Sequence, residues 1–259
     1  MPYFFKNFNL AIRQGFLIIF FLSLLLILKG QERGAVEAER VFVKEWNGTI
    51  MLHTNGFGLG FQHGRMPNYF DKHFWEINFQ YVIHPKSVRA RNPYYTGTSA
   101  YVYGKLVDLF LLRGGYGYQR TLHHKPYWGG VQINYNVSGG FSLGMAMPIY
   151  LYISYITPAG YSQLSEQYDP AIHNIDNIVQ RGPLLEGIFK TTFHPGFYLK
   201  SGLNFDFSKK ENVIHRLEIG LVFDMVFPVV QQMAYNKANL FYLSGYLAYN
   251  IGKKKGLYE

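Results

Sequence analysis

Polar and apolar residues alternate along stretches of about ten residues, and this alternation restricts the possible folds more than any other feature of the chain. In "WEINFQYVI" (75–83) the odd-numbered positions are apolar, whereas Glu76, Asn78 and Gln80 occupy even-numbered ones. Successive side chains of a β-strand point to opposite faces, so each such stretch is predicted to be a strand with one apolar face. A mean hydropathy of −0.06, despite 22 Tyr and 22 Phe, excludes a bundle of membrane helices.

Eight segments of the chain are predicted to be strands. They cover residues 48–63, 75–83, 106–120, 131–137, 141–151, 198–207, 217–225 and 241–251. Residues 138–140 ("SGG") and 208–212 ("SKKEN") are predicted turns, and residues 157–195 form one long external loop. An even number of antiparallel strands lets the first pair with the last while both termini stay on one side. The connection 85–103 is predicted to lie on the periplasmic side together with these short turns, and it is unusually long for a periplasmic turn.

The predicted fold is an all-β, eight-stranded antiparallel transmembrane barrel with lipid on its apolar face. Eight strands enclose an interior that side chains fill, so the polar face must be satisfied there. Buried charges need partners, and the inward set of three bases and four acids is nearly balanced. This predicted lumenal charge network consists of Glu76, Arg113, Lys200, Asp206, Arg216, Glu218 and Asp224. The alternative is a soluble β-sandwich, whose polar faces would be rich in lysine rather than in glycine, asparagine and tyrosine.

The first thirty residues are predicted to be a secretory signal peptide. Lys6 and Arg13 precede an apolar run of thirteen residues (16–28), which is shorter than the roughly 20 residues that cross a bilayer. Cleavage after Gly30 would leave Gln31 at the N-terminus; an uncleaved anchor is the alternative. We then expect a periplasmic segment at 31–46, the barrel at 47–252 and a basic tail at 253–259.

Export and composition narrow the range of partners. Of the 25 basic residues, 22 follow the predicted signal peptide, against 16 acidic residues, and the surplus is scattered. We therefore predict no nucleic-acid partner and a location in the cell outer membrane. The chain has no cysteine, which excludes disulfides and thiolate metal sites.

The chain resembles the small outer-membrane β-barrel proteins of Bacteroidota. The resemblance lies in Gln31 after the signal peptide, in "VQINYNVSGGFSLGMAMPIYL" (131–151) and in "PGFYLKSGLNFDF" (195–207), and it covers about 47–252. It implies a structural, transport-accessory or secretion-accessory component with outer-membrane lipid and a protein as partners. The chain lacks the terminal aromatic residue that closes the last strand in many barrels, since Ile251 is followed by "GKKKGLYE".

Residues 161–190 are the long stretch without strand alternation, and they contain too many apolar residues for a solvated loop. The spacing of Ile172, Ile175, Ile178 and Val179 predicts a short amphipathic helix after Pro170. This segment either caps its own barrel or binds a partner protein. The candidate partner-binding residues are Tyr168, Ile172, Ile175, Ile178, Leu184 and Leu185.

No motif in the chain specifies a reaction, so we predict a non-enzymatic protein without cofactors. Ser142, His215 and Glu218 could serve a hydrolase only if folding brought them together. A polar loop is the favoured interpretation of His123 and His124, with a metal site as the alternative. The alternative functions are a lipid-modifying outer-membrane enzyme and a narrow pore for small solutes.

The basic run at the C-terminus has two interpretations. Lys253, Lys254 and Lys255 could contact phosphate groups at the inner rim of the barrel, or they could form a solvated tail. We expect the tail.

Overall fold

The computed structural model describes residues 42–68, 70–95, 97–125, 130–158, 160–183, 186–208 and 212–256. The predicted signal peptide and residues 31–41 lie outside the described residues. Within the described part of the chain, no helix is long and apolar enough to cross a membrane.

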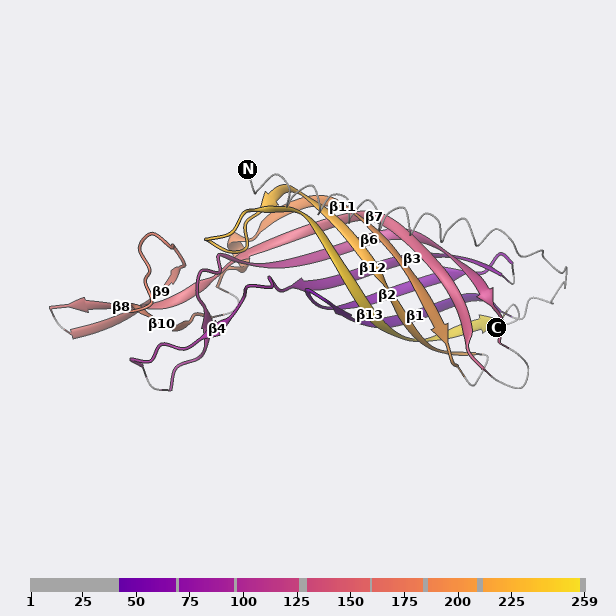
Figure 1. The fold of residues 1–259 in the computed structure, drawn as a ribbon, viewed down its shortest axis with the longest axis horizontal. Helices are drawn as coiled ribbons and strands as arrows, with labels where there is room; N and C mark the ends of the chain where they lie inside the picture. Colours follow the sequence, from indigo (N-terminus) through magenta and orange to yellow (C-terminus); the bar gives the residue numbers. More distant parts are fainter. Residues whose placement is uncertain are drawn as a thin grey trace, which may run out of the picture. The chain divides into compact units, whose positions relative to one another are not determined.

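Eight strands close into a barrel in the order β1-β13-β12-β11-β7-β6-β3-β2, and every neighbouring pair is antiparallel. Figure 1 shows these strands running at a slant to the long axis of the barrel. The predicted fold class is confirmed. The strands are β1 (Phe42–His53), β2 (Gly56–Arg65), β3 (Asp71–Val82), β6 (Val107–His123), β7 (Gln132–Pro148), β11 (Thr192–Asp206), β12 (Val213–Val230) and β13 (Asn239–Gly256).

Residues 48–63 form two strands, not the single strand that was predicted. The chain turns at Thr54 and Asn55, and Gly56 then has φ +150°, a value that favours glycine. The alternation changes phase at this turn. The outward-facing residues are even-numbered before it (Ile50) and odd-numbered after it (Phe57), and this change is the sequence feature that marks the turn.

Residues 138–140 form no turn; they lie in the middle of β7, which runs unbroken from Gln132 to Pro148. Gly140 lies opposite Gly115 of β6, and a Cβ atom on Gly140 would be 2.3 Å from the Gly114 carbonyl oxygen. These glycines therefore allow two strands to approach closely. The predicted hairpin of 131–151 is wrong, and this error offsets the missed turn, so the number of strands remains eight.

The extra turn between β1 and β2 also corrects the side on which the connection 85–103 lies. The connections 83–106, 149–191 and 231–238 all lie at the end of the barrel that carries this turn. The connections 66–70, 124–131 and 207–212, none longer than eight residues, lie at the other end, where β1 begins and β13 ends. The connection 85–103 is therefore a second long external segment, which contains β4 (Arg89–Ala90) paired with β5 (Tyr101–Val102).

The barrel strands begin before residue 47 and end after residue 252, the expected bounds of the barrel. Residues 42–46 belong to β1, and Lys253, Lys254 and Lys255 belong to β13. Lys255 lies opposite Lys44 in the register of these two strands. The prediction of a solvated tail is therefore wrong for residues 253–256, because backbone pairing with β1 holds them in the sheet.

The connection between β7 and β11 forms a small external sheet. Its strands are β8 (Tyr150–Thr157), β9 (Gly160–Gln167) and β10 (Ile178–Arg181), in the order β10-β8-β9, and a 3₁₀ helix (Ile188–Lys190) follows. Figure 1 shows this sheet projecting beyond one end of the barrel.

The helix predicted after Pro170 does not form, and residues 170–172 and 175–177 are turns instead. The Asp169 carboxylate accepts a hydrogen bond from the Ala171 N–H, and the Asn177 side chain accepts one from the Asn174 N–H. Such local bonds compete with helical ones. Ile178 and Val179 are buried in β10, so their spacing reflects the sheet.

Candidate functional site: a filled lumen and an external sheet

Charged side chains fill the lumen at the end where β1 begins. Arg216 of β12 donates from Nη1 and Nη2 to both Glu45 carboxylate oxygens, at 2.8 and 2.7 Å, and from Nε to Asp206 at 2.9 Å. Lys72 of β3 forms a second ion pair with Glu45. All four side chains are buried, and each charge has a partner of opposite sign.

A second charged group lies one step further along the lumen. Lys200 of β11 pairs with Glu76 at 3.1 Å and with Glu218 at 3.2 Å. Ser138 and Tyr198 donate hydrogen bonds to Glu76, at 2.6 and 2.9 Å. The two carboxylates therefore share one ammonium group, and the neighbouring hydroxyl groups satisfy further lone pairs.

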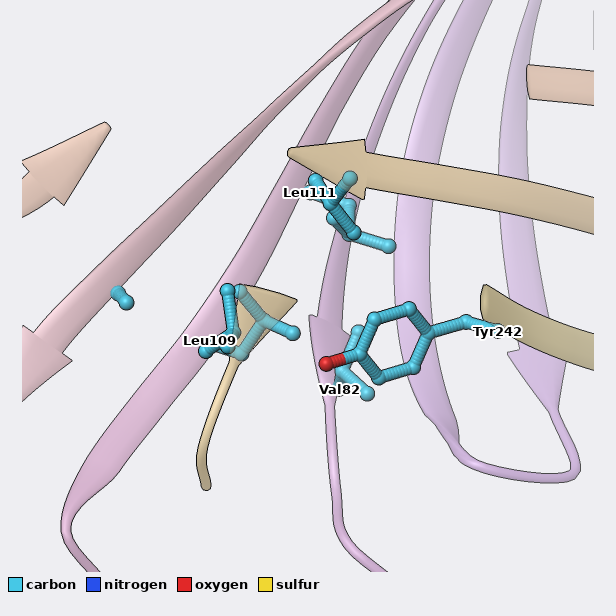
Figure 2. Close-up of a cluster of buried hydrophobic side chains, with 7 residues drawn as sticks. Val82, Leu109, Leu111 and Tyr242 are labelled. Atoms are coloured by element: carbon cyan, nitrogen blue, oxygen red, sulfur yellow. The ribbon is translucent and has the colours of Figure 1, made fainter. Parts of the chain in front are cut away.

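A third group crosses the lumen towards the external end. The Arg113 guanidinium donates two hydrogen bonds to Asp224 and one to Gln80. Beyond it, a cluster of buried apolar residues fills the barrel interior, with Val82, Leu109, Leu111 and Tyr242 pointing into the same space (Figure 2). The lumen is therefore occupied by paired charges over part of its length and by apolar side chains nearer the external end.

The structure places all seven members of the predicted charge network in the barrel interior. It arranges them in three groups, and among the described residues no ion pair joins one group to another. Sequence reasoning missed Glu45 and Lys72, because Glu45 fell in the expected periplasmic segment and Lys72 preceded the predicted strand 75–83. Glu45 keeps the polar phase of Asn47 and Thr49, and that signal could have found it. At Lys72 only the burial alternates, because Asp71 and His73 are also polar and the inward Phe74 is apolar, so no sequence signal marked it.

An ion-paired aspartate joins the external sheet to the barrel wall. Asp108 of β6 pairs with Lys105 and with Arg181 of β10, each at 2.6 Å, and Tyr81 donates a further hydrogen bond to it at 2.7 Å. Asp108 is buried by these contacts. The last strand of the external sheet is thus held directly to the rim of the barrel.

The external sheet has its own apolar core, which includes Ile149, Leu151 and Ile153. Tyr101, from the connection 83–106, belongs to the same core. Two predicted partner-binding residues, Tyr168 and Ile178, belong to this core, with exposed fractions of 4% and 0%. Burial is the largest cause of the raised pKa of the Tyr168 phenol. Neither residue is available to a partner, which corrects that part of the prediction.

The other predicted partner-binding residues have different outcomes. Ile172 and Ile175 are exposed, at 62% and 49%, whereas Leu184 and Leu185 lie outside the described residues. Further large apolar side chains are exposed on β9 and in the 3₁₀ helix, and they were not among the predicted partner-binding residues. We use the term external apolar surface for the exposed residues Tyr161, Leu164, Ile172, Ile175 and Phe189. Tyr161 and Leu164 lie on opposite faces of β9.

The candidate hydrolase residues do not meet in the structure. Ser142 faces the lumen beside Arg113 in the register of β6 and β7, and Glu218 is paired with Lys200. His215 lies on the outer face near the opposite end, where its ring contacts Tyr249 at 3.0 Å between Nδ1 and the hydroxyl. A nucleophile, a base and an orienting acid therefore cannot be assembled from these three residues.

The two adjacent histidines lie at the end of the barrel that carries the short connections. His123 ends β6 and His124 follows it, with its ring edge-on to Phe70 at 4.8 Å between centroids. Among the described residues, no three His, Asp or Glu side chains gather closely enough to hold a metal ion.

The outer face of the barrel is apolar between its two ends. Ile50, Leu59, Ile77, Leu221 and Leu247 are exposed there, on five different strands. A closed barrel with such an outer face and a polar, filled interior is a transmembrane β-barrel of the outer-membrane type, and the cell outer membrane is its location.

Comparisons with known proteins add similarity at the level of general shape. No family model and no curated protein matches the chain. It is similar to Neisserial surface protein A (12% identity, TM-score 0.36, 83% of this chain and 97% of that one) and to Ail of Yersinia pestis (9%, 0.38, 84% and 100%). It is also similar to the N-terminal barrel domain of Pseudomonas aeruginosa OprF (9%, 0.32, 83% and 99%). Because these scores are low, the class rests on the strand order and outer face of this chain.

Proposed function

We propose that this protein is a non-enzymatic outer-membrane barrel that presents its external sheet to a partner protein, as a structural or accessory component. The resemblance to the small barrels of Bacteroidota suggests a secretion or assembly complex as its setting; that affiliation stays a prediction. The barrel provides a fixed support in the membrane, and the external sheet provides the binding surface.

The external apolar surface carries this proposal. Phe189, in the 3₁₀ helix, is 97% exposed, and Tyr161, in β9, is 80% exposed. Large apolar side chains held in water on an ordered element are typical of protein interaction sites. Because the sheet has its own core and is ion-paired to the barrel through Asp108, it can present these residues without first folding.

The position of β9 at the edge of the external sheet supports the same function. β9 pairs with β8 on one side, and within the described ranges the sheet order gives it no neighbouring strand on the other. Edge strands are commonly protected by lysine or proline, and "GYSQLSEQ" (160–167) contains neither. An extended segment of a partner protein can therefore add to this edge while its side chains contact Tyr161 and Leu164.

The alternative that this segment caps its own barrel has less support. Its sheet projects beyond the end of the barrel (Figure 1), and the interior of the barrel is filled by the barrel's own side chains. The filled lumen also argues against the narrow pore, and the separation of Ser142, His215 and Glu218 argues against the hydrolase.

Substitutions at exposed positions test the proposal because they leave the core residues Tyr168 and Ile178 in place. A photo-crosslinking amino acid is placed at Leu164 or at Ile172 in whole cells, and at the lipid-facing Ile219 as the matched control. The proposal predicts one discrete protein adduct at both external positions and none at Ile219. Leu164→Ser should abolish the adduct at Ile172 while leaving the unfolding midpoint unchanged. No adduct at either external position would contradict the proposal.

A further inference from the structure

A row of positive charges crosses three adjacent strands at the end of the barrel where β1 begins. Lys44 of β1 lies directly opposite Arg65 of β2 on one side and directly opposite Lys255 of β13 on the other. Lys253 lies two residues before Lys255 on the same face of β13. All four side chains are exposed, and we call them the cationic row.

The cationic row faces outward, towards the surroundings of the barrel rather than its lumen. On β1, Lys44 shares its face with Trp46, Ile50 and Leu52, all of which are exposed. The inward-facing residue between Lys44 and Trp46 is Glu45, which is fully buried. The four cations therefore continue the lipid-facing surface beyond its apolar part, and they do not belong to the lumenal charge groups.

The register places these like charges close together without an anion between them. Side chains directly opposite each other on antiparallel strands have Cβ atoms about 5 Å apart, and like charges in this position repel. Among the described residues, none of the four forms an ion pair. The fold therefore keeps an unfavourable arrangement here that an external anion would relieve.

The level of the row along the barrel identifies the kind of anion. Trp46 lies next to Lys44 on the outer face and opposite both His63 and Lys253, and exposed apolar residues follow on all three strands. Aromatic residues mark the membrane–water interface of such barrels. Lys44, Arg65 and Lys255 lie one step beyond this aromatic level, where lipid phosphate groups are found, and Lys253 lies beside Trp46. The end with the short connections and the described chain ends faces the periplasm.

We propose that the cationic row binds the phosphate headgroups of anionic phospholipids in the inner leaflet of the outer membrane. Arg65 offers a planar donor pair for phosphate oxygens, and the three lysines add charge without a fixed geometry. Bound headgroups relieve the repulsion along the row and fix the depth of the barrel on the β13-β1-β2 side. The basic residues near the C-terminus thus contact lipid.

Unfolding of the full chain in vesicles tests this proposal. The wild-type protein and a Lys44→Gln, Arg65→Gln, Lys255→Gln variant are folded into vesicles of phosphatidylcholine, with or without phosphatidylglycerol. The matched control is Arg89→Gln, Arg91→Gln, Lys237→Gln, which removes three exposed cations at the other end of the barrel. The urea midpoint is read from the shift between folded and unfolded bands on gels run cold and boiled.

We expect phosphatidylglycerol to raise the midpoint of the wild type and of the control, but not that of the cationic-row variant. In phosphatidylcholine alone, the cationic-row variant should be at least as stable as the wild type, because its repulsion is gone. An equal gain from phosphatidylglycerol in all three proteins would overturn the proposal, since any cation would then suffice.

A second measurement covers the case in which the triple variant does not fold. The milder Lys44→Gln, Lys255→Gln pair is compared with the wild type by native mass spectrometry after extraction from mixed-lipid vesicles. The proposal predicts retained phosphatidylglycerol on the wild type and its loss on the pair variant. Equal retention on both would contradict it.

Discussion

Arg113 and Asp224 form a two-point ion pair across the lumen, from Nε to Oδ1 at 2.6 Å and from Nη2 to Oδ2 at 2.8 Å. The two residues belong to β6 and β12, which are separated in the barrel by β7 and β11. Both are buried, so each ion depends on the other for compensation of its lost hydration. This contact ties opposite parts of the barrel wall together beneath the apolar cluster.

Asp224→Asn should lower the free energy of unfolding by about 3–5 kcal/mol, because it leaves the Arg113 guanidinium buried without its counter-ion. Adding Arg113→Gln should recover part of this loss. Asp176→Asn makes the same chemical change at an exposed position and should have little effect. Urea titration in detergent micelles provides the midpoints. An unchanged midpoint for Asp224→Asn would mean that water reaches the pair.

Gly140→Ala should destabilise the barrel by about 1–3 kcal/mol, the usual cost of overpacking. Its Cβ atom would lie 2.3 Å from the Gly114 carbonyl oxygen and 2.5 Å from the Gly115 Cα atom. Gly114→Ala is the matched control, because no heavy atom lies within 4 Å of the added Cβ. The two unfolding midpoints should therefore differ clearly. Equal midpoints would contradict the continuous strand β7.

Ile77→Arg should impair insertion into a bilayer, since a charge on the lipid face near the middle of the membrane costs about 2–4 kcal/mol. Ile77 is exposed on the outer face of β3, whereas Ile172 is exposed on the external segment. Ile172→Arg should therefore insert as well as the wild type. Heat-modifiability on gels measures the folded fraction, and equal insertion of both variants would refute the assigned lipid face.

Asp108→Asn should loosen the external sheet while the barrel stays folded. The change removes two ion pairs, and hydrogen bonds to charged groups contribute about 1.5–3 kcal/mol each. Hydrogen exchange should become faster in β8 and β10 and remain slow in β3 and β12. The exposed Asp176→Asn serves as the control within the same external segment. Unchanged exchange in β10 would show that the core around Ile153 holds the sheet without Asp108.

Alternation was enough to predict a closed antiparallel barrel and the inward direction of seven of its charged residues. The predicted number of strands was eight only because two errors cancelled, the missed turn after His53 and the wrong hairpin at 138–140. The outward direction of Ile77 or Leu221 follows from a period of two, which holds wherever one face of a strand is buried. The same pattern placed Glu76 and Glu218 inside, although it could not show that both share Lys200. That contact depends on strand order and register, which a local pattern does not contain.

Glycine was the main source of error along the chain. Gly139 and Gly140 suggested a turn by their composition, yet they lie within a strand whose neighbour is also rich in glycine. Gly56 follows a real turn, but its neighbours Gly58 and Gly60 extended the apparent alternation across it. Glycine is suited both to turns and to close contacts between strands. Only the phase of the flanking apolar residues distinguishes a turn from a continuous strand.

The external segment was predictable only in part, because its apolar residues serve two purposes. Ile178 packs inside the sheet and Ile172 lies in water, although both are isoleucines a few residues apart. β9 has no alternation to detect, since neither of its faces is consistently buried. β10 pairs with β8 although β9 and the turns at 170–177 lie between them in sequence. This pairing buries Ile178 and leaves Ile172 exposed.

The inside–outside arrangement of the barrel is tested most directly by single cysteines along β3 and β7. The chain has no cysteine of its own, so each introduced residue can carry one spin label without interference. Accessibility to oxygen, which concentrates in lipid, should be high at positions 75, 77 and 79 and low at 74, 76 and 78. On β7 the same period of two should run without a break from 135 through 143. A loss of the period on β3, or a water-accessible break at 138–140, would contradict a barrel with these lipid and lumen faces.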